Sequence, residues 1–235
     1  MMKNGLKSKN FLKVLCGKID FIKNVKGEKN PIYRKLINKY NSLENNNKDE
    51  LPINIYEEIK DSIFIIKSGG RQGTGFLIKD LGIATCEHTI FNNKDIVYFK
   101  CNKILDKTNA TIVKKDKEKD IAILDYKFKN GDIYFEINRK SFNYGEEVTI
   151  AGFPAYRIGD QPRIIPAKIA GKRQDKYGNT RFIVDMGLYA GESGGIVLNK
   201  KNEISGMVVT GVENEAHHYE TAEFGIIPIS ELFKI

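Results

Sequence analysis

A serine between glycines is the residue of this sequence best suited to covalent chemistry. Ser193 lies in the run Gly191-Glu192-Ser193-Gly194-Gly195. A serine hydroxyl attacks a carbonyl only when a base lies beside it and hydrogen-bond donors face the oxyanion that forms. Flanking glycines let a substrate carbonyl approach the backbone closely. The run predicts an acyl-transfer nucleophile, with the amides of Gly191 and Ser193 as oxyanion donors; a glycine-rich hairpin turn is the alternative.

Two upstream residues could complete such a site. His88 stands in a Thr-x-x-His run just after the strand-like segment 82–85, which places an imidazole at a strand exit. An imidazole, with an ordinary pKa of about 6.5, accepts and returns a proton near neutrality. Asp120 directly precedes the apolar segment 121–124 and can hold the second imidazole nitrogen. Asp116 and Asp125 are rival candidates for the acid.

The serine run also fits the G-x-S-x-G pattern of α/β-hydrolases, in which the acid and the histidine follow the serine. Only 42 residues follow Ser193, and none of them is aspartate. The body of the sequence also lacks the alternating β/α pattern that this fold requires. We therefore exclude that fold.

The elements that must position these residues are short strands. β-branched or aromatic runs separated by Gly, Asn, Asp or Lys clusters occur in two batches of six. The first batch is 63–67, 74–79, 82–85, 96–99, 111–114 and 121–125, and the second is 147–152, 164–170, 181–185, 195–198, 204–210 and 223–228. This pattern predicts a mainly β protein of two antiparallel six-stranded β-barrels. A short amphipathic piece at 55–59 precedes the strands, and residues 229–233 are expected to form a short helix.

The order His, Asp, Ser and the runs around these residues resemble the chymotrypsin/trypsin family of serine proteases. Within it, the Gly-x-Gly-Phe, Thr-x-x-His, Asp-x-Ala-x-Leu and Gly-x-Ser-Gly-Gly runs are most similar to the bacterial stress-protease branch. The segments 145–154, ending Gly-Phe-Pro, and 224–228 resemble the strand that opens the second barrel and the final strand of the family. The resemblance covers roughly residues 55–235. It implies that His88, Asp120 and Ser193 form a catalytic triad that cleaves peptide bonds.

The sequence departs from the family at several positions. Glu192 stands where classical trypsins have the Asp that pairs with a freshly cut N-terminus, and no activation site resembling Ile-Val-Gly-Gly is present. Activation by chain cleavage is therefore unsupported, and the Glu192 side chain is expected to pair with a cation or to face solvent. We see no sequence after Ser193 that could form the PDZ domain of the stress proteases.

The resemblance also marks the positions that frame the primary specificity pocket. They are Gly187, then Val209, Thr210 and Gly211, and finally Gly225. Gly187 supplies no carboxylate floor, although Asp185 lies close in sequence. Val209 stands where the glutamate-specific members have a histidine. We expect an open, mainly apolar pocket.

The basic charge is concentrated at the N-terminus. Residues 1–52 carry +7 of the formal net charge of +8, and apolar residues recur there at helical spacing before a polar run at 44–50. We therefore expect a basic helical extension at 1–52 and a protease domain at 53–235, with barrels at about 53–140 and 141–235. The extension is expected to pack on its own domain as a regulatory cap or as a segment on which a regulatory partner docks. Contact with nucleic acid or an anionic membrane is the alternative.

The composition limits the cellular compartment that we expect for the protein. Three cysteines, Cys16, Cys86 and Cys101, cannot build a full disulfide framework, and no apolar run is long enough for a membrane span or a signal peptide. We expect a cytoplasmic bacterial enzyme without cofactor or metal, since His217 and His218 are interpreted as a charged hairpin tip. The expected function is a serine endopeptidase that acts on protein or peptide substrates, as a dedicated regulatory, defence or stress protease. The alternative is a catalytically silent trypsin-like scaffold that binds proteins.

Overall fold

The computed structural model of the chain describes residues 55–91, 93–101, 103, 105–210 and 225–235. The chain divides into two units, Met1–Asn54 and Ile55–Ile235, and the second contains every element described below. The helices predicted within 1–52 and the histidine pair His217 and His218 lie outside the described residues. The boundary near residue 52 and the role of the extension stay predictions.

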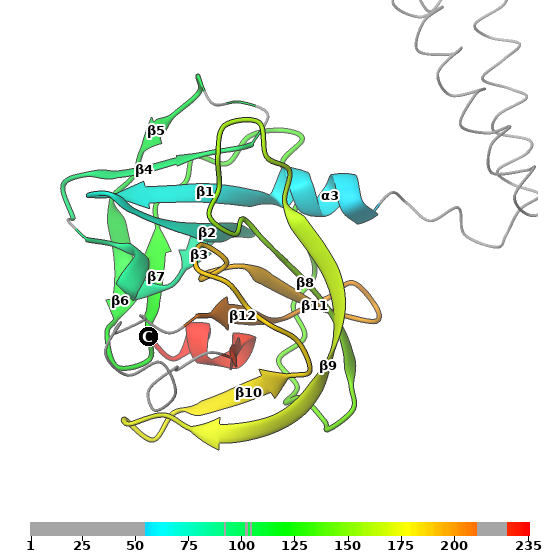
Figure 1. Ribbon diagram of the computed structural model, residues 1–235. Coiled ribbons are helices and arrows are strands. Elements are labelled where there is room, and N and C mark those ends of the chain that lie inside the picture. Colours follow the sequence, from blue (N-terminus) through cyan, green and yellow to red (C-terminus); the bar gives the residue numbers. More distant parts are fainter. Residues whose placement is uncertain (1–54, 92, 102, 104, 211–224) are drawn as a thin grey trace, which may run out of the picture. The chain divides into compact units, whose positions relative to one another are not determined.

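The first half of the described chain is a curled antiparallel sheet (Figure 1). The helix α3 (Ile55–Ser62) precedes this sheet and buries Ile59. Acidic residues in its first turn interact favourably with the positive end of the helix dipole. Seven strands follow in the order β5-β4-β1-β2-β3-β7-β6. Their bounds are β1 (Ile63–Ser68), β2 (Arg71–Ile78), β3 (Gly82–Thr85), β4 (Ile96–Phe99), β5 (Thr108–Asn109), β6 (Ile112–Asp116) and β7 (Ile121–Leu124). A single 3₁₀ turn, η1 (Glu87–Thr89), follows β3.

The second half is a closed six-stranded barrel in the order β10-β13-β12-β11-β8-β9. β9, which is long and strongly curved in Figure 1, pairs with both β8 and β10 and so closes the sheet on itself. The strands are β8 (Glu147–Gly152), β9 (Arg163–Gln174), β10 (Thr180–Val184), β11 (Ile196–Asn199), β12 (Ile204–Val209) and β13 (Gly225–Pro228), and a 3₁₀ helix, η2 (Ile229–Phe233), ends the chain.

Three clusters of buried side chains fill this architecture. One belongs to the first sheet and one to the second barrel. The third joins the two halves, because it includes Phe76 and Ile121 from the first and Phe153, Ile196 and Val209 from the second. Interiors of this kind are packed as densely as organic crystals, so the two halves are fixed against each other.

The mainly β double-barrel fold expected from the sequence is confirmed, with one difference in strand number: the second half is a closed six-stranded barrel, whereas the first is a curled sheet of seven strands because β5 adds to its edge. The predicted segments 82–85, 96–99, 147–152 and 229–233 coincide with β3, β4, β8 and η2. The strand predicted at 74–79 begins earlier, as β2 at Arg71, since only Gly69 and Gly70 form the preceding turn, with left-handed φ of 52° and 85°. The pairing of Ser68 with Arg71 makes this a two-residue hairpin loop, and β2 begins directly after it.

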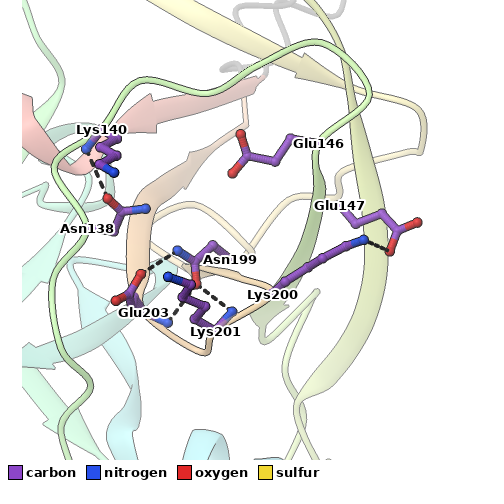
Figure 2. Close-up of a pocket in the computed structure, with 8 residues that line it drawn as sticks. All are labelled: Asn138, Lys140, Glu146, Glu147, Asn199, Lys200, Lys201 and Glu203. Carbon is purple, nitrogen blue, oxygen red and sulfur yellow. Dashed lines mark hydrogen bonds and ion pairs between the residues drawn. The ribbon is translucent and has the colours of Figure 1, made fainter.

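Two surface findings bear on function. Among the described residues, no helix combines the length and the apolar character needed to cross a bilayer. A cleft of about 360 Å³ lies at the beginning of β8 and the end of β11, and eight polar or charged residues line it (Figure 2). Several of these groups bind one another: Lys200 pairs with Glu147 at 3.1 Å, and the Asn199 amide donates to Glu203 at 2.7 Å. The cleft therefore resembles an ordinary charged turn region.

The hairpin between β9 and β10 is fastened by a buried ion pair. Arg181 Nη2 lies 2.9 Å from Asp175 Oδ2, and both side chains are almost completely buried. Arg181 Nη2 also donates to the carbonyl of Lys119 at 3.0 Å, whereas its Nε and Nη1 have no hydrogen-bond partner in the structure. Because the guanidinium has so few partners, its burial depends on Asp175.

We expect the substitution Asp175→Asn to lower the free energy of unfolding by about 3 kcal/mol or more, since it leaves a buried cation without its counter-charge. Chemical denaturation measures this change. Glu147→Gln is the matched control, because it breaks an exposed pair with Lys200, and such pairs contribute less than about 1 kcal/mol. Equal effects of the two substitutions would contradict this interpretation.

Candidate active site

Three predicted residues form one chain of hydrogen bonds between the two halves of the protein. His88 Nδ1 lies 2.7 Å from Asp120 Oδ2, and His88 Nε2 lies 3.0 Å from Ser193 Oγ. The backbone N–H of His88 also donates to Asp120 Oδ1 at 2.9 Å. Asp120 thus contacts both the ring and the backbone of the histidine, which fixes the orientation of the imidazole.

The strand pairing explains why His88 and Asp120 meet. β3 and β7 are neighbours, with Thr85 opposite Ala122, so the residues just after β3 lie beside those just before β7. His88 lies on the 3₁₀ turn η1 that follows β3, and Asp120 immediately precedes β7 with a left-handed φ of 60°. Ser193 comes from the loop before β11, in the second barrel.

The loop before Ser193 is held by its carbonyl groups. Ala190 O accepts from Ala155 N at 2.9 Å, and Glu192 O accepts from Gly195 N at 2.8 Å. In a trans peptide the next N–H points opposite to the carbonyl. The N–H groups of Gly191 and Ser193 therefore point away from the two donors, Ala155 N and Gly195 N. Hydrogen-bond donors beside a serine hydroxyl can stabilise the negative oxygen that forms in acyl transfer, so this orientation is consistent with the oxyanion role predicted for the two amides.

Gly191 is required by its surroundings as well as by its φ of 93°. A Cβ atom there would lie 2.6 Å from Phe153 O, 2.8 Å from Ala155 N and 2.9 Å from Gln72 Nε2. The loop thus packs directly against both halves of the protein, and a side chain at this position would displace it.

Thr74, on β2, connects this loop to the first half. Its Oγ1 donates to Gly191 O at 2.8 Å and accepts from Phe153 N at 2.9 Å, and its N–H donates to Ser193 O at 2.8 Å. The side chain is completely buried. The sequence predicted Thr74 only as the first residue of a strand, because its hydrogen-bond partners lie up to 117 positions away.

The predicted pocket residues lie in different surroundings. Thr210 contacts the serine itself: its N–H donates to Ser193 Oγ at 3.2 Å, and the two hydroxyls share a short hydrogen bond. Val209 is buried in the core that joins the halves and pairs with Gly225 across β12 and β13. Gly187 lies in the loop before the serine, where its carbonyl accepts from Arg163 Nη1 at 3.3 Å. Gly211 lies outside the described residues.

The Asp185 carboxylate is held at the backbone of β9, because its Oδ1 accepts from the Lys168 N–H at 2.7 Å. Another acid next to the serine is engaged differently: Glu192 is completely buried and pairs with Arg163 at 2.8 Å. The sequence predicted a cation partner or exposure for Glu192 without identifying Arg163, which lies 29 residues upstream.

A cysteine lies behind the histidine. Cys86, His88 and Asp120 are the one group of three potential metal ligands found among the described residues, with donor atoms within 4.8 Å of one another. Burial raises the pKa of the Cys86 thiol well above its usual value, and the Asp120 carboxylate raises it further. The thiol therefore stays protonated and donates to Val208 O at 3.3 Å. A protonated thiol is a poor metal ligand and a poor nucleophile, so this group does not fit a metal site.

The comparison with known families identifies the family of the chain. The profile of the trypsin-like peptidase domain matches residues 73–207, which is more than half of the chain. The chain belongs to this family. It is accordingly a serine protease, and residues 88, 120 and 193 all lie within the matched segment. Among curated proteins, none matches the sequence.

Solved structures show the same fold at low sequence identity. The Rv3671c protease of M. tuberculosis H37Rv, in an inactive form, is 20% identical with a TM-score of 0.60, over 77% of this chain and 87% of its own. A serine endoprotease from Yersinia pestis is 21% identical with a TM-score of 0.60, over 79% and 66% of the two chains. The HtrA-type protease AlgW, solved with a tripeptide, is 17% identical with a TM-score of 0.62, over 77% and 61%.

The contacts of Thr74 lead to a testable prediction. Thr74→Val keeps the shape of the side chain but removes the hydroxyl, which leaves Gly191 O and Phe153 N without this partner. We expect the free energy of unfolding to fall by about 1–3 kcal/mol. We also expect kcat on a peptide substrate to fall by up to about 10²-fold, because the oxyanion-facing amides lose their support. Thr74→Ser retains the hydroxyl and should behave like the wild type; equal losses in both variants would contradict this account.

Proposed function

We propose that the protein is an endopeptidase that hydrolyses internal peptide bonds through a Ser-His-Asp acyl-enzyme mechanism. The observation that carries the proposal is the hydrogen-bond chain from Asp120 through His88 to Ser193 Oγ. It lies beside two loop amides whose preceding carbonyls are already bound. Nucleophile, base, orienting acid and oxyanion donors are the parts that acyl transfer from a peptide requires.

The proposed chemistry proceeds in two halves. Ser193 Oγ attacks the scissile carbonyl carbon while His88 Nε2 takes the hydroxyl proton, and the amides of Gly191 and Ser193 stabilise the oxyanion. The tetrahedral intermediate expels the amine, which takes the proton from His88, and the acyl group stays on Ser193. Water then attacks the ester, its proton passes to His88, and the acid product leaves as the proton returns to Ser193. Asp120 stabilises the imidazolium in both halves.

We further propose that the enzyme works inside the cell on a restricted set of proteins, in regulation, defence or stress. The structure supports a reducing compartment, since Cys86 is a buried free thiol. A regulatory partner docking on residues 1–52 remains part of this proposal, on the basis of their positive charge. The substrates are proteins or peptides, as the family implies.

The first test is covalent labelling. We expect a fluorophosphonate probe to label the wild type at Ser193 and not the Ser193→Ala variant. On a peptide library, Ser193→Ala should lower turnover by about 10⁶-fold, the loss known for subtilisin. Asp120→Asn should lower it by about 10⁴-fold, because the histidine loses its orienting acceptor. A wild type that neither reacts with the probe nor cleaves any peptide would favour the alternative of a silent binding scaffold.

A second test concerns the residue on the amino side of the cleaved bond. Gly187 carries no side chain, and the Asp185 carboxylate binds the backbone of β9, so neither residue offers a free charge to a substrate side chain. We therefore expect a peptide library scanned at that position to show preference for apolar side chains. A profile dominated by Lys, Arg or Glu would contradict an apolar pocket.

A further inference from the structure

Glu192 places a buried charge directly before the nucleophile. Its side chain has no exposed surface, yet both carboxylate oxygens have donors: Oε1 accepts from Arg163 Nη1 at 2.8 Å, and Oε2 accepts from the Tyr189 N–H at 2.7 Å. A carboxylate removed from water is tolerated only when it is paired and hydrogen-bonded. The conformation that buries Glu192 therefore depends on the guanidinium of Arg163.

Arg163 comes from a different part of the second barrel. It is the first residue of β9, where it pairs with Gly152 of β8. Besides Glu192, its Nη1 donates to Gly187 O at 3.3 Å, and its guanidinium carbon lies 4.8 Å from the centre of the Tyr189 ring. One side chain thus contacts the beginning, the middle and the end of the segment 187–192.

The segment held in this way contains the amides that face the oxyanion. Gly191 and Ser193 flank Glu192, so a movement of the Glu192 backbone would turn the peptide units that carry both amides. Thr74 fixes the same loop from the first half of the protein, through Gly191 O. Arg163 fixes it from the second, through Glu192 Oε1.

We propose that Arg163 is a positioning residue that holds the oxyanion-donating loop in its active arrangement through Glu192, so that the site forms without cleavage of the chain. This inference rests on the proposed function of Ser193 and its loop. The cation that pairs with Glu192, the acid directly before Ser193, is the Arg163 side chain of the folded protein itself. An arginine suits this role, because its planar guanidinium binds the carboxylate, a carbonyl and an aromatic ring at once and stays charged at high pH.

The test compares Arg163→Met and Arg163→Lys with the wild type, in the full-length chain. Arg163→Met should lower kcat by about 10²- to 10³-fold, the loss expected when an oxyanion donor is misplaced, with a smaller change in KM. Arg157→Met is the matched control, because Arg157 is an exposed arginine between β8 and β9. It should leave both constants unchanged.

The pH profile separates positioning from a merely structural role. Arg163→Lys keeps a cation, so its kcat near pH 7.5 should recover at least ten-fold relative to Arg163→Met. Lysine loses its charge at about pH 10.4, whereas arginine does not. The groups that face this side chain are the Glu192 carboxylate and the Tyr189 ring. We therefore expect the kcat of Arg163→Lys to fall reversibly between about pH 9 and 11, well before that of the wild type.

Three results would overturn the inference while leaving the proposed function intact. One is full activity of Arg163→Met in an enzyme that Ser193→Ala inactivates. Another is equal activity of Arg163→Lys and Arg163→Met at pH 7.5 when both melt at the wild-type temperature. The third is an alkaline limb of Arg163→Lys that coincides with that of the wild type. If Arg163→Met does not fold, the dependence of kcat on pH in Arg163→Lys alone tests the inference. A wild type without activity or labelling would instead remove the proposed function.

Discussion

The packing of the two β halves through one apolar core is the constraint on which the site depends. His88 and Asp120 belong to the first half and Ser193 to the second, so no single half contains the hydrogen-bond chain. Side chains such as Phe76 and Phe153 fill the space between the halves, and dense interiors resist small displacements. The 3.0 Å separation between His88 Nε2 and Ser193 Oγ is therefore set by packing that lies beneath the cleft.

Buried ion pairs fix the positions of elements that apolar packing alone does not determine. Apolar contacts have no direction, whereas a buried carboxylate must meet a specific donor. Glu192 with Arg163 fixes the loop before the serine, and Asp175 with Arg181 fixes the β9–β10 hairpin against the backbone of Lys119, next to Asp120. Both pairs thus join separate elements near the site.

The sequence predicted most of the fold because its strands are locally encoded. β3, β4 and β8 are β-branched or aromatic runs bounded by turn residues, and their bounds agree with the prediction. β5 was missed, since Thr108 and Asn109 are exposed polar residues without a strand pattern. β9 is longer than predicted, because its last three residues, Lys172 to Gln174, are polar and do not resemble part of a buried strand. His88, Asp120 and Ser193 were identifiable from short motifs, whereas the contacts of Thr74 and Arg163 join residues far apart in sequence.

The loop before Ser193 combines these two kinds of constraint. On one side Thr74, carried by a strand of the first half, binds the carbonyl of Gly191; on the other side Arg163, carried by β9, binds the carboxylate of Glu192. A shift of either half moves one of these anchors and therefore turns the peptide units between them. The same displacement would lengthen the contact between His88 and Ser193. In the proposed mechanism, nucleophile activation and oxyanion binding are consequently coupled, because both depend on the single relative position of the two halves.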